Sequence, residues 1–152
     1  MKLVSACLLG VRCNWRGDES YLDGNVLKLA GAEPVLPVCP EQLGGLPTPR
    51  VPQEIHGGSG EDVLVGRARV INKEGVDVTA QVIRGAEETL KLARLAGITE
   101  FIGKSGSPSC GCNWIYDGSF SGKQTSGKGV TAALLEKHGI SLIPQEELAA
   151  QG

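Results

Sequence analysis

The chain has 152 residues, the length of one domain, and a second domain would need roughly another 100. Hydrophobic residues make up 41% of the chain and charged residues 21%, which excludes wholesale disorder. The net charge of −2 predicts neither a nucleic-acid polymer nor an anionic membrane as partner, and no apolar run approaches the ~18 residues of a membrane span. We therefore expect a single domain over residues 1–152.

The N-terminal part of the chain predicts a strand, a helix and a second strand. Leu3–Ala6 is an apolar run typical of a buried strand, and Cys7 follows it. Asn25–Ala30 carries apolar residues at helical spacing. Val35–Val38 predicts the second strand, and Cys39 follows it directly.

The middle of the chain predicts irregular structure and then a long helix. Residues 40–60 are rich in proline and glycine, so we expect a long functional loop there. Val63–Ile71 and Val76–Val78 flank a turn and predict a small hairpin. Thr79–Ala96 has the clearest helical spacing, with Thr79 as the expected cap.

The C-terminal part predicts strand, helix and strand. Ile98–Gly103 is the third expected strand, and the loop after it leads to Cys110. Residues 122–129 resemble a phosphate-binding loop, but Gly129 stands where such loops need Ser or Thr to hold Mg²⁺. We therefore expect a flexible loop leading into a helix over Val130–Lys137, followed by a fourth strand over Ser141–Ile143.

This order of elements predicts an α/β fold: a small, open, mainly parallel sheet with helices on both faces, Rossmann-like. A short β-hairpin and long Gly/Pro loops are expected to complete it. In open sheets of this kind, ligands bind outside the carboxyl ends of the strands.

Three cysteines follow predicted strands, namely Cys7, Cys39 and Cys110. Parallel strands lie about 4.8 Å apart, so side chains leaving neighbouring strand ends can converge. Three converging thiolates would repel one another unless a cation or cluster lay between them. The paired spacing of structural zinc sites is absent, whereas an iron–sulfur cluster tolerates widely separated ligands.

Two interpretations of the cysteines stay open at this point. The five thiols cannot all pair within one chain, and free cysteines also pack as small buried hydrophobes. Cys13 could substitute as a ligand or serve redox chemistry, and Cys112 could be a resolving thiol.

Polar side chains near these cysteines are candidates for catalysis. Glu41 follows Cys39 after one proline, which stiffens the turn and aims the carboxylate for proton transfer. Ser107 precedes a proline and could donate its hydroxyl hydrogen to a developing anion. The alternatives are a solvated loop glutamate and a turn-stabilising serine. Arg50 is a candidate anion or structural anchor.

The segment Val4–Cys7 looks like a lipoprotein cleavage box, but only three residues precede it, too few for the ~7–15-residue apolar stretch of a signal peptide. We expect a cytoplasmic protein, where thiols stay reduced.

Several long motifs together resemble the family called domain of unknown function 523. They are Ser5-Ala6-Cys7-Leu8-Leu9-Gly10, the run from Cys39-Pro40-Glu41 to Thr48-Pro49-Arg50, Asp77-Val78-Thr79, Ser107-Pro108-Ser109-Cys110-Gly111, Asp117-Gly118-Ser119-Phe120 and Gly127-Lys128-Gly129-Val130-Thr131.

The resemblance implies an enzyme, because characterised members of that family are thiouracil desulfidases. They carry an oxygen-sensitive 4Fe-4S cluster held by three cysteines and convert 2-thiouracil to uracil and hydrosulfide. By motif, the ligands here would be Cys7, Cys39 and Cys110, with Glu41 and Ser107 matching residues implicated in catalysis. The loop after Cys13 reads Asn14-Trp15-Arg16-Gly17 instead of the frequent Arg-Tyr-Asp-Gly, which bears on the substrate.

The sequence thus predicts a cluster-dependent, non-redox desulfidase that acts on a small thiolated nucleobase. The family's chemistry implies one iron left open to the substrate's sulfur. The first alternative is a non-catalytic iron–sulfur module, a redox sensor or sulfur carrier, whose function would survive Glu41→Ala. The second is a small-molecule binding domain with core cysteines.

Overall fold

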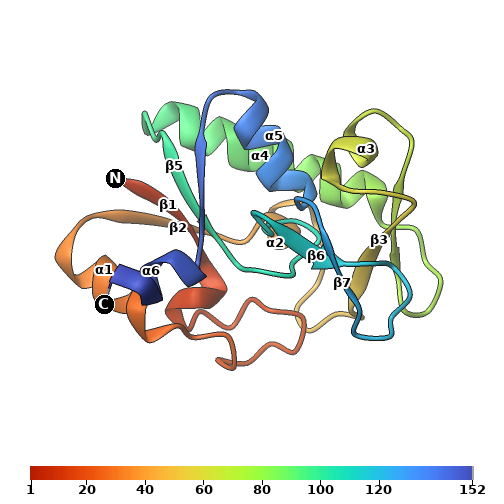
Figure 1. The fold of residues 1–152 in the computed structure, drawn as a ribbon, viewed down its shortest axis with the longest axis horizontal. Helices are drawn as coiled ribbons and strands as arrows, with labels where there is room; N and C mark the ends of the chain where they lie inside the picture. The colour runs from red at the N-terminus through yellow and green to blue at the C-terminus, as the bar shows by residue number, and fades with distance from the viewer. Residues whose placement is uncertain (152) are drawn as a thin grey trace.

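A four-stranded parallel sheet forms the centre of the protein in the computed structural model, which describes residues 1–151. Its strands are β1 (Lys2–Ser5), β2 (Val35–Val38), β5 (Glu100–Gly103) and β8 (Ser141–Pro144). They lie in the order β2-β1-β5-β8 (Figure 1). This arrangement confirms the predicted α/β class and places the three strands that precede the cysteines side by side.

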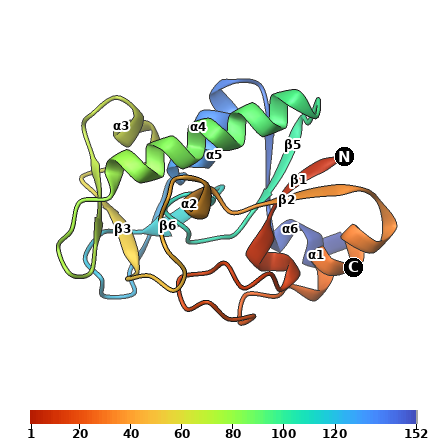
Figure 2. The same cartoon turned by 180° about the vertical axis from the view of Figure 1, so that it is seen from behind.

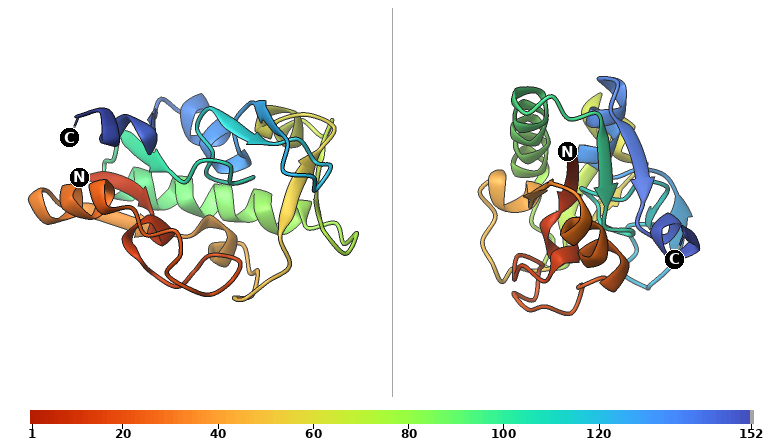
Figure 3. Two further views of the ribbon diagram at one scale, coloured as in Figure 1. Left: turned by 60° about the horizontal axis from the view of Figure 1, so that its bottom comes forward. Right: turned by 90° about the vertical axis from the view of Figure 1, so that its left-hand side faces the viewer.

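Helices cover both faces of this sheet, as the two views in Figure 3 show. α4 (Thr79–Leu95) and α5 (Val130–Lys137) pack on one face, and α1 (Gly24–Ala32) and α6 (Glu146–Gln151) lie on the other. The alternation of a β-strand explains this: Leu3 and Phe101 enter the core under α4 and α5, whereas their neighbours Val4 and Ile102 enter the core under α1. All four side chains are fully buried.

A second region packs against the other end of α4 (Figure 2). It contains the antiparallel pair β3 (Gln53–His56) and β4 (Arg69–Asn72), with α3 (Gly60–Leu64) between them. A further antiparallel pair, β6 (Trp114–Tyr116) and β7 (Gln124–Ser126), occupies the glycine- and serine-rich segment. The antiparallel hairpins therefore exist, but their strands differ from the predicted ones.

The predicted hairpin over Val63–Ile71 and Val76–Val78 is confirmed only around its turn, because the first half of its first strand is helical. Ser59 and Asp62 form a capping box that starts α3, so Val63 belongs to a helix. β4 then pairs with β3, which lies in the stretch predicted as loop. Around the predicted turn, Ile71 forms a bridge with Asp77, and the N–H groups of Asn72 and Val78 donate to the carbonyls of Val76 and Val70 at 2.8 and 2.9 Å.

Two short helices also begin where the sequence predicted a turn or loop. η1, a 3₁₀ helix (Ala6–Leu9), follows β1 at once, and α2 (Pro40–Leu43) follows β2, with proline at its first position. Thr79 is not the cap of α4: the Asp77 carboxylate accepts the Thr79 N–H at 2.9 Å.

α2 lies directly on α4 because two glycines let the backbones touch. A Cβ atom on Gly85 would stand 1.9 Å from the Pro40 carbonyl oxygen, and one on Gly44 would stand 1.9 Å from the Gln81 carbonyl oxygen. No other residue type fits without moving one helix. This contact fixes the segment that carries Cys39 and Glu41.

Candidate functional site

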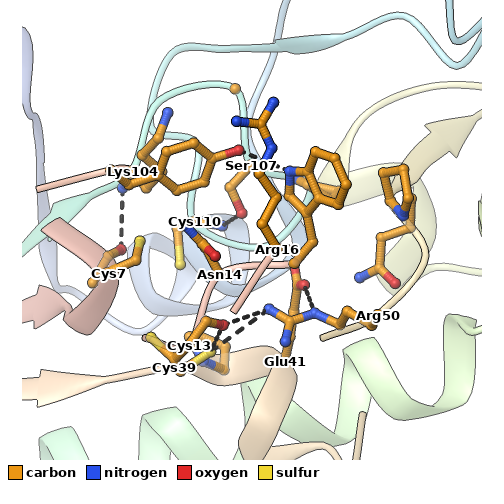
Figure 4. A pocket seen from close by; sticks show the side chains of 18 of the residues that line it. Cys7, Cys13, Asn14, Arg16, Cys39, Glu41, Arg50, Lys104, Ser107 and Cys110 are labelled. Carbon is orange, nitrogen blue, oxygen red and sulfur yellow. Dashed lines mark hydrogen bonds and ion pairs between the residues drawn. The ribbon is translucent and has the colours of Figure 1, made fainter. Parts of the chain in front are cut away.

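A cavity of about 350 Å³ opens at the carboxyl ends of β1, β2 and β5. Cys7, Cys39 and Cys110 all line it, together with Glu41 and Ser107 (Figure 4). The strand order explains the convergence, because β1 lies between β2 and β5. The chain adds β2 on one side of β1 and β5 on the other, and ligands of open α/β sheets bind where the strand order reverses in this way. The structure therefore brings together all five sequence-predicted site residues.

The three cysteines that line the cavity belong to three different structural elements. Cys7 lies within η1, and Cys39 is the residue that precedes α2. Cys110 ends a loop that folds back on β5, where a Cβ on Gly103 would stand 2.1 Å from the Cys110 carbonyl oxygen.

The amino end of α5 anchors the Cys110 loop. The N–H groups of Val130 and Ala132 donate to the carbonyls of Pro108 and Ser109, at 2.7 and 3.1 Å. These are donors that a helix start otherwise leaves without partners. Because the protein already uses these two donors, they do not serve a phosphate at the glycine-rich run before α5, in line with its atypical Gly129.

The thiols differ in how readily they ionise. Burial raises the pKa of Cys7 to about 12, with a further contribution from the negative charge of Cys39. Burial also raises the pKa of Cys110 well above its ordinary value, although a hydrogen bond from Ser5 opposes this. A hydrogen bond with Cys13 instead lowers the pKa of Cys39 to about 7. Three ionised thiols in this space would need a positive centre between them.

The two remaining cysteines have different surroundings. Cys13 lines the cavity, and its carbonyl oxygen lies 3.5 Å from Cys39 Sγ. Cys112 packs instead in the core under α4 and α5, and its thiol faces the carbonyls of Cys110 and Ile143. The structure therefore places Cys13 beside the site and Cys112 away from it.

The donor set fits a cluster better than a single ion. Among the described residues, no three His, Cys, Asp or Glu side chains converge closely enough to hold one metal ion. Ligands of an iron–sulfur cubane bind different irons and stand further apart than ligands of one ion. Cys7, Cys39 and Cys110 supply three thiols around one cavity, which are the ligands that such a cluster uses.

Glu41 is held by a buried ion pair and a buried hydrogen bond. Arg50 Nε donates to Glu41 Oε1 at 2.8 Å, and the two side chains are only 7% and 11% exposed. Ser109 Oγ donates to Glu41 Oε2 at 3.0 Å. The carboxylate is therefore fixed in one orientation at the cavity wall, unlike a solvated loop glutamate.

Arg50 also ties together the segments around the site. Its guanidinium donates to the Cys13 carbonyl at 2.8 Å and to Thr48 Oγ1 at 3.0 Å, and lies 4.0 Å from Cys39 Sγ. Despite burial, the negative charges of Glu41 and Cys39 raise the pKa of Arg50. The sequence named Arg50 as an anchor but did not show that Glu41 is its partner.

The two serines of the Ser107-Pro108-Ser109 motif have separate roles. Ser107 Oγ accepts the N–H groups of Ser109 and Cys110 at 3.1 and 3.0 Å, so it stabilises the turn that presents Cys110. Its own hydroxyl hydrogen stays available in the cavity, which Ser107 lines. The contact of Ser109 with Glu41 was missed, because nothing in the sequence places residue 109 beside residue 41.

The cavity lining also includes aromatic and basic side chains. Trp15, Tyr21 and Tyr116 belong to it, and the Lys104 amine lies 4.5 Å from the centroid of the Tyr21 ring. Burial lowers the pKa of Lys104, and the charge of Cys7 opposes this change. Such a wall suits a planar, polarisable ligand.

One cavity residue has an unused hydrogen-bond donor. Gln53 is 7% exposed, and its Nε2 has no hydrogen-bond partner within the described residues. A buried amide group without a partner costs about 1–3 kcal/mol.

No helix among the described residues is long and apolar enough to cross a membrane.

Comparison with known proteins gives three matches. The sequence profile of a family described as 2-thiouracil desulfurase matches residues 3–147. The chain is 45% identical over 148 residues to the uncharacterised protein YbbK of Bacillus subtilis (strain 168), covering 97% of each chain. It also superposes on the structure of a 4Fe-4S-dependent thiouracil desulfidase, TudS, with a TM-score of 0.82 and 43% identity, covering 98% of this chain and 95% of that one.

Proposed function

Because the chain belongs to the 2-thiouracil desulfurase family, we propose that it is a 4Fe-4S-dependent desulfidase acting on a thiolated nucleobase such as 2-thiouracil. The observation that carries this proposal is the presence of Cys7, Cys39, Cys110 and Glu41 around one cavity. The structural relative is itself 4Fe-4S-dependent, in agreement with the cluster expected from the sequence.

The proposed reaction replaces sulfur by oxygen at the thiocarbonyl carbon. Water supplies the oxygen, sulfur leaves as hydrosulfide, and 2-thiouracil becomes uracil with no electrons gained or lost. Cys7, Cys39 and Cys110 would hold the cluster, which would supply Lewis-acid chemistry at the C–S bond.

The protein's own groups supply proton transfer and orientation. Glu41 retains lone pairs beyond those used by Arg50 and Ser109, so its carboxylate accepts a proton from the attacking water. Ser107 uses its free hydroxyl hydrogen to bond the substrate or the departing sulfur. Trp15, Tyr21 and Tyr116 lie along the face of the planar ring.

The proposal is tested by anaerobic cluster reconstitution followed by incubation with 2-thiouracil. We expect broad visible absorption that bleaches in air, and equal amounts of uracil and sulfide. Single Ala variants of Cys7, Cys39 and Cys110 should lose the cluster, whereas Cys112→Ala, the matched control outside the cavity, should keep it. A loaded protein that forms neither uracil nor sulfide rejects this substrate, and full iron content in Cys7→Ala rejects that ligand.

The second candidate, a non-catalytic iron–sulfur sensor or sulfur carrier, is separated from the enzyme by Glu41→Gln. This substitution keeps the side chain's shape and lets its amide oxygen still accept from Arg50. We expect an unchanged iron content and visible spectrum, with turnover lowered at least ~100-fold, the usual contribution of a general base. Unchanged turnover would reject Glu41 as the general base, whereas a loaded wild type without turnover would favour the non-catalytic module.

A further inference from the structure

Gln53 places an amide donor in the wall of the cavity without giving it a partner. It is the first residue of β3, where antiparallel pairing with Asn72 fixes its backbone. Its side chain is more than nine-tenths buried and lines the same cavity as the three cysteines. A rigid strand therefore holds Gln53 in the lining of the cavity.

Packing alone does not explain a polar residue at this position. Ile55, two residues further along β3 on the same side, is part of a hydrophobic core cluster. The chain neighbours Val51 and Pro52, which also line the cavity, carry apolar side chains. A leucine would fill this place without leaving a donor unpaired.

Three other buried polar atoms of the described residues also lack a hydrogen-bond partner, but each lies outside the cavity lining or beside a polar group. His56 Nε2 and Thr131 Oγ1 belong to residues outside the cavity lining. Ser105 lines the cavity, but its hydroxyl lies beside the Glu146 carboxylate. Gln53 Nε2 is thus the donor that calls for a ligand acceptor.

We propose that Gln53 is a specificity-determining residue that donates a hydrogen bond to the substrate's ring carbonyl, the one that keeps its oxygen. The inference rests on the proposed function and narrows its substrate class to pyrimidine-type thiones with a second carbonyl group. A site built to bond a carbonyl discriminates against analogues that lack it.

The test measures ligand binding to the anaerobically reconstituted protein, and so does not depend on turnover. Uracil, the expected product, is compared with 2-pyrimidinone, which lacks the second carbonyl, by equilibrium dialysis. Wild type should bind uracil about three- to tenfold more tightly, the value of one hydrogen bond. In Gln53→Leu, the ratio of the two affinities should fall to about one, because only the binding of uracil is weakened.

Two further variants complete the test. Gln53→Glu, of nearly the same shape, should weaken uracil at least as much, because its carboxylate would face the carbonyl oxygen; it carries the test if Gln53→Leu fails to fold. Thr131→Val removes a partnerless buried hydroxyl outside the cavity and should keep the wild-type ratio.

The outcomes separate this inference from the proposed function. A wild-type ratio in Gln53→Leu or Gln53→Glu, with wild type still converting 2-thiouracil, overturns the role of Gln53 alone. A loaded wild type that neither binds uracil nor converts 2-thiouracil overturns the proposed function and this inference with it.

Discussion

Glu41 shows how much a single residue depends on partners distant in the sequence. Its carboxylate is fixed by Arg50, nine residues later, and by Ser109, in the loop that follows β5. Motif order alone predicted that Glu41 and Ser107 belong to the site. It did not predict that Ser109 holds Glu41 while Ser107 holds the backbone of Cys110.

Ser109→Ala should therefore lower turnover without removing the cluster. Glu41 would keep Arg50 but lose one of its two fixed contacts, so we expect about a tenfold loss of kcat, equivalent to ~1.4 kcal/mol. Turnover and iron content are measured together. Thr89→Val is the matched control, because Thr89 also loses a buried hydroxyl bond, to the Gly85 carbonyl, but lies outside the cavity. Wild-type turnover in Ser109→Ala would contradict the positioning role.

At the scale of elements, the site depends on how α2 and α4 are held. α2 carries Glu41 and follows Cys39, and it touches α4 through Gly44 and Gly85. The start of α4 is in turn fixed by Asp77, which also pairs with Arg69 at 2.7 Å.

Gly85→Ala should separate α2 from α4. The new methyl group would overlap the Pro40 carbonyl. We therefore expect the free energy of unfolding to be about 1–3 kcal/mol lower than in wild type, together with a lower iron content. Urea unfolding of the reconstituted protein measures this. Gly31→Ala, in α1 with open space around it, should be neutral or stabilising by up to ~1 kcal/mol. Equal stability of the Gly85 variant and wild type would show that α2 moves freely.

Asp77 predicts a pH dependence of stability. Hydrogen bonds from Thr79, and then the Arg69 guanidinium, lower the pKa of Asp77. A carboxyl whose pKa is lower in the folded state stabilises the fold above its unfolded pKa, and this stabilisation is lost as the pH falls through the folded value. The free energy of unfolding should thus fall less steeply below about pH 4 in Asp77→Asn than in wild type. Identical slopes would mean that Asp77 adds nothing at its helix start.

On the scale of the whole molecule, the site closes the carboxyl edge of the sheet. Cys7, Cys39 and Cys110 follow three adjacent strands, so a group bound by all three links β2, β1 and β5. The three hydrophobic clusters are built mainly from other residues and hold the rest of the fold.

Removing the cluster should therefore lower Tm while leaving the secondary structure in place. A group that binds only the folded state adds its binding free energy to stability. Each kcal/mol corresponds to about 2–4 °C in a chain of this size, so we expect a loss of several degrees. Circular dichroism of loaded and chelator-stripped protein measures both properties. Cys7→Ala should show no such difference, and an equal Tm for both wild-type forms would argue against a cluster that bridges the strands.

The sequence predicted the sheet well because its signals are local. Apolar runs such as Val35–Val38 and the helical spacing of α4 were confirmed. The region from Pro40 to Val78 was predicted only in part, because its two short strands pair with each other outside the main sheet and its helices are about a single turn long. For the site, the convergence of the three cysteines could be predicted because each follows a predicted strand. The contacts of Arg50, Ser109 and Gln53 depend on tertiary packing and could not.

Cys110 and Cys112 are separated by one glycine, yet Cys110 lines the cavity whereas Cys112 does not. This segregation bears on damage by oxygen. Without a cluster, Cys7, Cys13, Cys39 and Cys110 would present their thiols around one cavity, whereas Cys112 lies outside its lining. Inactivation in air should then be reversible, since a reductant need only restore the cavity's own sulfurs before iron and sulfide are added back.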